Sequence, residues 1–510
     1  MATAVAAPRV ENAAEVFLGR AAALHPSAPA ARDRAGEWTY ATLDAASRTF
    51  ALRLAEYGVR PGDRVLARTG SVREFLAALY GTWRHGAVFV PVSPAMKTFH
   101  LRAVLEDAAP ALVLTTPEER EGVDELRWPE SCRAAVLDEI DLTWPGPEDP
   151  PEDPAPPVPA DRLALLIYTS GSTSAPKAVA CPHAPVAFAA RAIAARLGYR
   201  QDDVVLTAVP LSFDYGLYQA LLCALSGAEL LLSDADSHAR LLGYARENGA
   251  TVVPVVPSLG ELLVKLTARD RRRTRIRLFT NTGAALGAPL IASLREAFPG
   301  ARVAPMFGTT ECKRITILEP DGDIGRPGSV GPALPGTEVL ILDDEGGRLS
   351  PYEIGEIAAR GPHVMAGYWR APEATAQRFR PGADGQVVLH TGDYGWLDED
   401  GHLYFQGRRD DLFKRRGLRM SAIEIEAATL DIDGVRAASL LVPEEGRDMV
   451  LFTVGELTGE QVRARLAERL EDAKVPDDCH VLDALPLTPN GKTDRKRLKA
   501  LLKEWEEADA

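Results

Sequence analysis

Short apolar runs alternate with amphipathic stretches through the middle of the chain, and this alternation constrains the fold more than any other feature. Between Leu163 and Met306, runs such as LALLIY, VVLTAV and TVVPVV are separated by longer segments with helical periodicity, such as HAPVAFAARAIAARLG. Strands and helices that alternate at this spacing predict an α/β fold with mostly parallel, helix-covered sheets. In such sheets, binding sites lie at the carboxyl ends of the strands.

Two changes of pattern predict further parts of the molecule. The segment Trp144–Arg162 is so rich in proline and acid that we expect an exposed, extended connector. Beyond Glu338, short strands separated by Gly and Pro turns predict a small β-rich region. The last stretch, about 100 residues, has helices and strands of its own and suits a small α+β domain. We therefore predict an N-terminal domain at residues 1–409 and a C-terminal domain at residues 410–510.

Charge and cysteine usage argue against several classes of protein. The net charge of -14 is unfavourable for binding nucleic acid, because phosphate backbones attract basic surfaces. No uncharged apolar run reaches the roughly 20 residues that cross a bilayer, so we expect no membrane insertion. The N-terminus lacks a basic start followed by an apolar core, and the cysteines are scattered singly. Both features favour a reducing cytoplasm over secretion, a disulfide framework or a zinc site.

The segment Thr169–Lys177, TSGSTSAPK, follows the apolar run LALLIY and offers hydroxyls, backbone N–H groups and an ammonium in one short turn. Such a turn can hold an anion. A nucleotide-binding P-loop would need Gly at 176 and Ser or Thr at 178, where this chain has Pro176 and Ala178. We therefore expect a different kind of phosphate loop, and an ordinary surface turn is the alternative.

Three further motifs follow in the chain. FGTTE places Glu311 beside two hydroxyls, a donor set that suits the Mg²⁺ of a nucleotide, although a lone Glu is often only a capping or solvated residue. HTGD places Asp393 after a glycine turn, where it could accept both hydroxyls of a ribose, and Arg408 follows. PNGK places Lys492 on a tight turn, where a solvated lysine is the common outcome.

Together and in this order, the four motifs resemble those of the adenylate-forming superfamily: acyl- and aryl-CoA ligases, luciferases and the adenylation domains of nonribosomal peptide synthesis. The resemblance extends from GEWTYATLDAASRTFA near Trp38 to NGKTDR. It implies that a carboxylate attacks the α-phosphate of Mg-ATP to give an acyl-adenylate, which a pantetheine thiol then takes up. Such chemistry depends on positioning and positive charge more than on a protein nucleophile.

The resemblance also implies roles for individual residues. The ATP-binding residues would be Thr169, Ser170, Gly171, Ser172, Thr173, Lys177, Phe307, Gly308, Thr309, Asp393 and Arg408. The catalytic residues would be Thr310, Glu311, which would also bind Mg²⁺, and Lys492, which would govern the adenylation rate. The small domain would rotate about Asp410 between the half-reactions, and Gly417 would flank the pantetheine channel.

At two positions the chain departs from the family's phosphate loop, because Ser174 and Ala178 replace glycines. If residue 174 needs φ > 0, serine there costs roughly 1 kcal/mol of strain, so ATP binding could be weakened. A nucleotide-binding regulatory protein without turnover is therefore an alternative to an enzyme.

The substrate is indicated by LSFDYG, in which Phe213 and Asp214 match amino-acid-activating members of the superfamily. Asp214 would pair with the substrate amine, although it could instead cap a helix that starts near Gly216. Arg314, in ECKR, would suit a second carboxylate unless it is only structural. The expected substrate-binding residues are Phe213, Asp214, Tyr218, Thr280, Thr282, Gly283, Met306, Lys313 and Arg314.

We therefore expect an AMP-forming ligase that activates an amino acid, of the β-amino or dicarboxylic kind, in nonribosomal peptide or polyketide biosynthesis. Its acceptor would be the phosphopantetheine thiol of a separate carrier protein, or CoA. The alternative is an acyl- or aryl-CoA ligase that acts on an unaminated acid. The basic run Arg269–Arg277 is interpreted as a solvated helix end rather than a partner surface.

Overall fold

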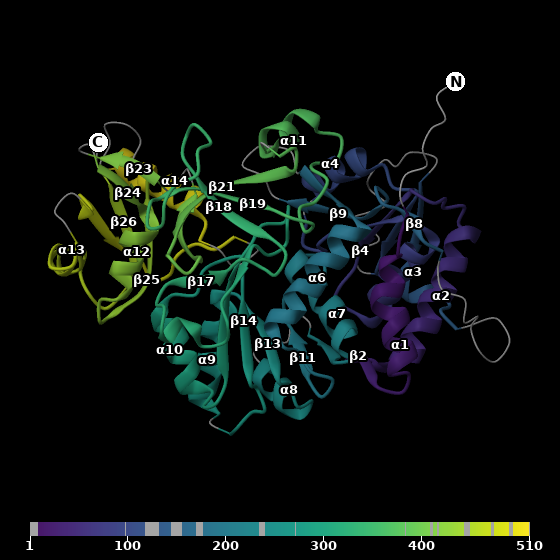
Figure 1. Cartoon of the computed structure of the whole chain (residues 1–510). Coiled ribbons are helices and arrows are strands. Elements are labelled where there is room, and N and C mark those ends of the chain that lie inside the picture. The colour runs from purple at the N-terminus through teal and green to yellow at the C-terminus, as the bar shows by residue number, and fades with distance from the viewer. Residues whose placement is uncertain are drawn as a thin grey trace.

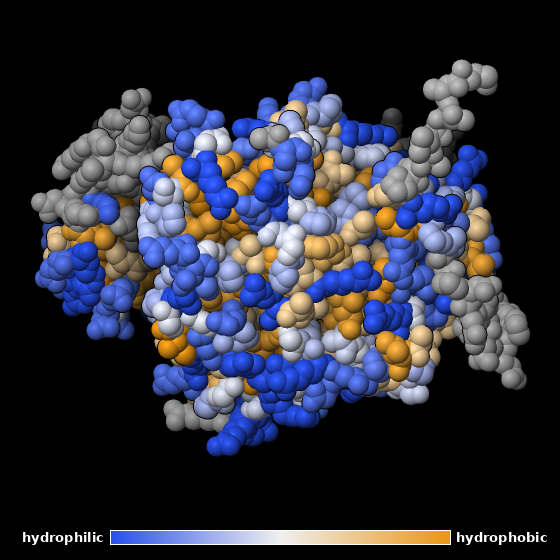
Figure 2. All heavy atoms as spheres, in the orientation of Figure 1, coloured by the Kyte–Doolittle hydropathy of each residue, from blue (hydrophilic) through white to orange (hydrophobic). Residues whose placement is uncertain are grey.

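A computed structural model of the chain shows a large N-terminal body of helix-covered sheets and a small C-terminal part to one side (Figure 1). The described residues are 9–96, 98–117, 132–143, 156–169, 177–233, 240–270, 272–382, 384–408, 412–415, 418–442, 449–470, 474–488 and 493–508. Among them, no helix combines the length and the apolar character needed to cross a membrane. On the face shown in Figure 2, hydrophilic residues surround smaller apolar patches.

The first sheet has six strands in the order β10-β9-β5-β4-β6-β7. Five of them are parallel, and only the edge strand β10 runs antiparallel to its neighbour. The strands are β4 (Arg64–Arg68), β5 (Val88–Pro91), β6 (Leu112–Thr115), β7 (Arg133–Val136), β9 (Leu163–Thr169) and β10 (Lys177–Pro182). The neighbouring helices are α2 (Tyr40–Glu56), α3 (Arg73–His85), α4 (Thr98–Ala108) and α6 (His183–Leu197).

The second sheet has eight strands in the order β16-β15-β14-β13-β11-β12-β2-β3, and only the two edge strands are antiparallel. Its strands are β2 (Pro29–Asp33), β3 (Gly36–Thr39), β11 (Val204–Thr207), β12 (Glu229–Leu232), β13 (Val252–Val255), β14 (Leu278–Asn281), β15 (Arg302–Phe307) and β16 (Thr316–Ile317). The crossover helices are α7 (Asp214–Ser226), α8 (Leu241–Glu247), α9 (Pro257–Arg269) and α10 (Ala288–Ala297).

These two sheets confirm the predicted α/β fold of mostly parallel, helix-covered sheets. The alternating run that starts at Leu163 is divided between them, because β9 joins strands from the first part of the chain. Central strands such as Leu112–Thr115 and Val252–Val255 are buried along their whole length, which explains their continuous apolar sequences.

The predicted β-rich region is an antiparallel sheet in the order β17-β22-β21-β19-β18, with β20 paired to β21. Its strands are β17 (Ser329–Pro332), β18 (Glu338–Leu342), β19 (Gly355–Arg360), β20 (Phe379–Pro381), β21 (Val387–Leu397) and β22 (His402–Arg408), and α11 (Pro372–Arg378) precedes β20. Val339, Ile341, Ile357 and Leu389 bury one face. Alternation between that face and a more polar one is typical of such sheets.

The C-terminal part is α+β and has its own core around Ile425, Leu440, Leu451 and Leu466. Its strands are β23 (Leu412–Arg415), β24 (Leu418–Ser421), β25 (Val435–Leu441), β26 (Val450–Gly455) and β27 (Asp478–Val481), and its helices are α12 (Ala422–Leu430), α13 (Gly459–Ala467) and α14 (Arg495–Ala508). The predicted boundary at residues 409 and 410 lies outside the described residues. Most of the predicted connector, residues 144–155, does too, while β8 (Val158–Pro159) pairs with β1 (Arg9–Val10).

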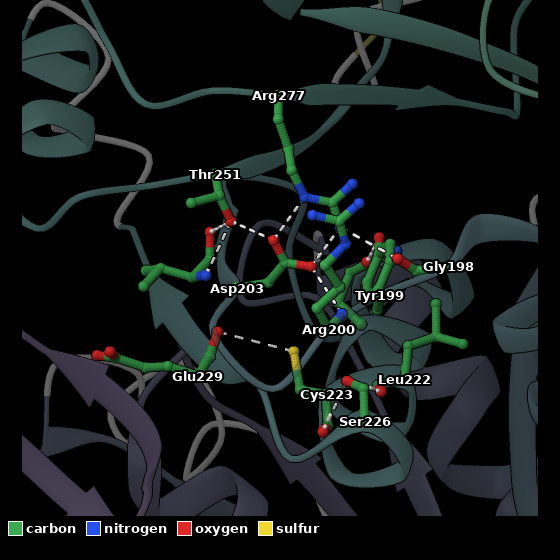
Figure 3. A network of polar contacts seen from close by, with 12 residues as sticks. Gly198, Tyr199, Arg200, Asp203, Leu222, Cys223, Ser226, Glu229, Thr251 and Arg277 are labelled. Atoms are coloured by element: carbon green, nitrogen blue, oxygen red, sulfur yellow. Dashed lines mark hydrogen bonds and ion pairs between the residues drawn. The ribbon is translucent and has the colours of Figure 1, made fainter.

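One arginine of the basic run Arg269–Arg277 has a structural role (Figure 3). Arg277 forms an ion pair with Asp203, which is 2% exposed and also accepts a hydrogen bond of 2.7 Å from Thr251. Burial opposes the charge on Asp203, but the hydrogen bonds from Arg277 and Thr251 outweigh it and lower the pKa of this carboxyl. The interpretation as a solvated helix end is therefore wrong for Arg277, although the side chain of Arg272 is 79% exposed.

Candidate active site

The predicted phosphate loop connects two antiparallel strands. Thr169 ends β9 and lies opposite Lys177, which begins β10, and the Thr169 hydroxyl donates to the Lys177 carbonyl at 3.4 Å. A strand rather than a helix therefore follows the loop, which agrees with the expectation that it is not a P-loop. The loop itself, with Ser170, Gly171, Ser172, Thr173 and Ser174, lies outside the described residues.

Ala178, one of the two departures from the family's loop, is a strand residue of β10. It pairs with Tyr168 on β9, is 1% exposed, and packs in an apolar cluster with Leu66 and Leu166. An extended strand position does not require φ > 0, so alanine is unstrained here. The methyl group instead adds to the core beside the loop.

The FGTTE motif forms a tight turn directly after β15. The carbonyl of Thr309 accepts hydrogen bonds from the backbone N–H groups of Cys312 (3.2 Å) and Lys313 (2.7 Å). A Cβ at Gly308 would lie 2.2 Å from the Lys313 carbonyl oxygen, so only glycine allows this turn to close. The predicted ATP contact of Gly308 stays a prediction, but its packing role is clear.

Glu311 is half-buried in this turn, and its carboxylate is held by a residue that the sequence analysis missed. The hydroxyl of Tyr368 donates to Glu311 Oε1 at 2.5 Å, and the N–H of Met365 donates to the Glu311 carbonyl at 2.9 Å. Oε2 has no hydrogen-bond partner among the described residues. A carboxylate oxygen, with the hydroxyls of Thr309 and Thr310 next to it in the chain, is a hard donor set of the kind that fits Mg²⁺.

Asp393 lies on β21, where it is 5% exposed and pairs in register with Arg408 on β22. The backbone thus brings the two predicted ribose-binding residues together. Phe307, at the end of β15, stacks on Phe405 of β22 with ring centroids 5.2 Å apart, so an aromatic wall lies in the same part of the molecule.

The turn before Asp393 is fixed by Glu356 of β19. Glu356 hydrogen bonds to the His390 ring at 2.9 Å and accepts from the Gly392 N–H at 3.0 Å. Burial opposes the charge on Glu356, but its bonds to His390 and Gly392 outweigh this and lower its pKa. Nothing in the isolated GEI sequence indicated this contact.

The predicted substrate residues lie around the start of α7 and the ends of β14 and β15. Helix α7 begins at Asp214 itself, with Phe213 as N-cap and no side-chain capping bond, so the alternative of a cap for a helix starting near Gly216 is wrong. Tyr215 donates to the Thr280 carbonyl at 2.7 Å, which joins α7 to β14. The same strand ends carry three more of the predicted residues. Thr282 and Met306 are buried, and Gly283 has φ 83°.

Lys313 and Arg314 are 0% and 4% exposed, respectively. Lys313 Nζ lies 3.5 Å from Cys181 Sγ and 5.8 Å from the ring centroid of Tyr218. Arg314 donates to the Lys313 carbonyl at 2.6 Å and lies 5.0 Å from the ring centroid of Tyr215. Neither cation forms an ion pair with a carboxylate in the described part of the chain.

Asp214 lies one helical turn before Tyr218 on α7 and is close enough to act on it electrostatically. Burial raises the pKa of Tyr218 well above its ordinary value, and electrostatic interactions with Cys181 and Asp214 raise it further. The Tyr218 hydroxyl and Arg314 Nε are buried without a hydrogen-bond partner in the described residues. Two buried cations and a buried hydroxyl without a described partner therefore lie close together, one helical turn from Asp214, which is a costly arrangement without a ligand.

The remaining predicted residues, Lys492, Asp410 and Gly417, lie outside the described residues, and nothing of the Arg408 side chain is described. Their roles stay predictions.

Comparison with known families and proteins agrees with this geometry. The family of AMP-binding enzymes matches residues 18–369, and the family of AMP-binding enzyme C-terminal domains matches residues 424–492. CymA of Salinispora arenicola (strain CNS-205), a probable nonribosomal peptide synthetase, is 32% identical over 93% of this chain, which spans 6% of its length. The 2-succinylbenzoate–CoA ligase of Geobacillus kaustophilus (strain HTA426) is 30% identical over 96% of this chain and 98% of its own.

Two solved structures are informative. VinN, solved alone and with L-aspartate, is 42% identical over 79% of this chain and all of its own, with TM-scores of 0.71 and 0.70. MatB from Rhodopseudomonas palustris, solved with ATP bound, is 28% identical over 96% of this chain and 99% of its own, with a TM-score of 0.82. The chain therefore belongs to the AMP-binding enzymes of the adenylate-forming superfamily and is an AMP-forming ligase that adenylates a carboxylic acid.

Proposed function

We propose that this ligase activates an amino acid with a second carboxylate, and then transfers it to the phosphopantetheine thiol of a separate carrier protein. The observation that carries the proposal is the pair of buried cations, Lys313 and Arg314, packed against α7, the helix that begins at Asp214. The proposal thereby extends the Arg314 hypothesis to Lys313.

The charges of the pocket fit such a substrate. Lys313 and Arg314 contribute +2 and Asp214 contributes -1, so the cluster carries a net charge of +1. A dicarboxylic amino acid carries a net charge of -1 at neutral pH. Its ammonium would pair with Asp214 and its second carboxylate with the two cations, which would satisfy the buried charges.

The relatives support the same choice. VinN, 42% identical, was solved with L-aspartate, an amino acid with a second carboxylate. Similarity to CoA ligases, such as that of Geobacillus kaustophilus, keeps an unaminated acid and CoA as the alternative pair of substrates.

In the proposed reaction, an oxygen of the reacting carboxylate attacks the α-phosphorus of ATP, the bond to the bridging oxygen breaks, and pyrophosphate leaves. Lys177 and the hydroxyls of the loop would hold the β- and γ-phosphates, and Asp393 the ribose. Mg²⁺, held by Glu311 and Thr310, would neutralise charge on the phosphates. Lys492 would stabilise charge as it develops on the leaving oxygens.

In the second half-reaction, the thiolate sulfur attacks the acyl carbon and AMP leaves with its oxygen. The small domain would reorient about Asp410 before this step, and Gly417 would flank the thiol's path. The acyl group ends as a thioester, which is the form in which assembly enzymes accept it.

The test is amino-acid-dependent ATP–pyrophosphate exchange across α-amino, β-amino, dicarboxylic amino, fatty and aryl acids. We expect exchange with dicarboxylic amino acids. Arg314→Met should lower kcat/KM for them about 100-fold, because a buried charge without its partner costs about 3 kcal/mol. Lys313→Met should act in the same direction.

The matched control is Arg302→Met, which removes an exposed arginine from the start of β15 and should leave exchange unchanged. Exchange confined to unaminated acids would overturn the proposal in favour of a CoA ligase. If Arg314→Met lowers kcat/KM equally for monocarboxylic amino acids, the cations do not bind a second carboxylate.

A further inference from the structure

We infer that Tyr368 is a positioning residue for Glu311. Its hydroxyl occupies one oxygen of the Glu311 carboxylate and leaves the other oxygen for the metal ion. The inference rests on the proposed function, in which Glu311 binds Mg²⁺. Its basis is the hydrogen bond of 2.5 Å from the Tyr368 hydroxyl to Glu311 Oε1. A bond of this length from a phenol to a carboxylate is short and strong, because the acceptor is charged.

Tyr368 is itself held in place from two sides. Its N–H donates to the Thr375 hydroxyl at 2.9 Å, and its ring packs edge-on against Phe379 with centroids 5.7 Å apart. The preceding Gly367 has φ 107°, and a Cβ there would lie 2.4 Å from Thr375 Cγ2. The backbone can therefore bring Tyr368 against α11, the helix that contains Thr375, only because residue 367 is glycine.

The segment that carries Tyr368 runs alongside β10, the strand that leaves the predicted phosphate loop. Val179 forms an antiparallel bridge with Tyr368, and the N–H groups of Ala180 and Trp369 bond to Gly367 and Ala178, each at 2.9 Å. Lys177 lies at the start of the same strand. One rigid pairing thus sets the position of the phosphate-binding strand and of the Glu311 carboxylate together.

The consequence concerns how Glu311 can bind a cation. Since the phenol takes Oε1, and Oε2 has no hydrogen-bond partner among the described residues, Glu311 is arranged as a one-oxygen ligand. Mg²⁺ demands near-octahedral geometry from few protein ligands, and a carboxylate fixed in this way meets that demand. Without the hydroxyl, Glu311 is free to rotate, and its oxygens are no longer distinguished.

The test uses Mn²⁺ as the probe, with a non-cleavable α,β-methylene analogue of ATP bound to the full-length protein. Mn²⁺ binding is followed by electron paramagnetic resonance. Tyr368→Phe keeps the ring and its packing, so we expect the variant to stay folded, with thermal unfolding lowered only by the loss of one hydrogen bond. Because second-shell partners typically contribute 10–100-fold to metal affinity, we expect Mn²⁺ binding to weaken about tenfold and its spectrum to change.

Two more variants make the result decisive. Tyr404→Phe removes another tyrosine–carboxylate bond, to Asp398 at 3.3 Å, and should leave Mn²⁺ binding as in the unmodified protein. Glu311→Gln should weaken binding, and adding Tyr368→Phe to it should cause no further loss, since the phenol acts through Glu311.

The outcomes separate the inference from the function on which it rests. If Glu311→Gln leaves Mn²⁺ binding unchanged, the metal role of Glu311 is wrong and the inference falls with it. If Glu311→Gln weakens binding while Tyr368→Phe does not, only the positioning role is wrong. Equal weakening by Tyr368→Phe and Tyr404→Phe would also overturn it, because the effect would then not be specific to the site.

Discussion

At the scale of single residues, two positions at which the side chain is small or absent differ in the reason for it. Gly308 must lack a side chain because the carbonyl of Lys313 lies where its Cβ would be. Ala178 fills a buried strand position with its methyl group, although the family's motif has glycine there. The family pattern alone could not distinguish these cases, because strain and packing both depend on neighbours that are distant in the sequence.

We predict that Ala178→Gly destabilises the protein by about 1–2 kcal/mol, through the lost buried methyl group and the added backbone freedom of glycine. The KM for ATP should not improve, since no strain is relieved. Urea unfolding and pyrophosphate exchange measure the two effects. Ala134→Gly, on an exposed position of β7, is the control for backbone freedom alone. A lower KM for ATP in Ala178→Gly would contradict this account.

At the scale of elements, contacts between neighbouring strands shape the site. Glu356 of β19 holds the turn before Asp393 through His390 and Gly392. We predict that Glu356→Gln raises the KM for ATP about tenfold, because a neutral amide cannot satisfy both partners equally and the turn loosens. Steady-state kinetics with varied ATP measures this effect.

Glu338→Gln is the matched control for that prediction. Glu338 lies on the adjacent strand β18 and pairs with Arg348 and Arg360, away from the turn. If both variants raise the KM for ATP equally, the effect belongs to the sheet and not to the turn.

The elements that could be predicted from sequence are those with a strong period. The runs VVLTAV, ELLL, TVVPVV and RVAPMF all fall on strands of the second sheet. Strand β10 was missed, because the run KAVACP is short and lies directly between the predicted phosphate loop and the helix that begins at His183. The burial of Lys313 and Arg314 could not be predicted either. Charged residues are mostly exposed, and these two are buried only because Tyr215 and Tyr218 of α7 and Cys181 of β10 pack around them.

At the scale of the whole molecule, two buried histidines tie acid stability to folding. His183 accepts a hydrogen bond of 3.1 Å from the Ala13 N–H, and His363 is 0% exposed. Burial lowers the pKa of His183 to about 3 and that of His363 to about 4. Both rings are therefore neutral in the folded state at pH 5, whereas in the unfolded chain they are charged.

The unfolded state thus binds more protons below about pH 6.5, so stability falls as the pH falls. We predict that His363 alone lowers the free energy of unfolding by about 2 kcal/mol between pH 7 and pH 5, and that this loss continues down to its folded pKa of about 4. Urea unfolding at several pH values should show a shallower decline for His363→Met. His100→Met, at an exposed position, should keep the original slope. Identical slopes for all three proteins would exclude this mechanism.

The ion pair between Asp203 and Arg277 has a further consequence for the evolution of this fold. Asp203, Thr251 and Arg277 immediately precede β11, β13 and β14, whereas the pocket residues follow β14 and β15 at the opposite edge. One edge of the sheet therefore stabilises the fold, and the opposite edge carries the substrate pocket. Residues at the pocket edge can therefore be exchanged while the ion pair at the opposite edge is kept. In this way the substrate of such a fold can change without loss of the contacts that stabilise it.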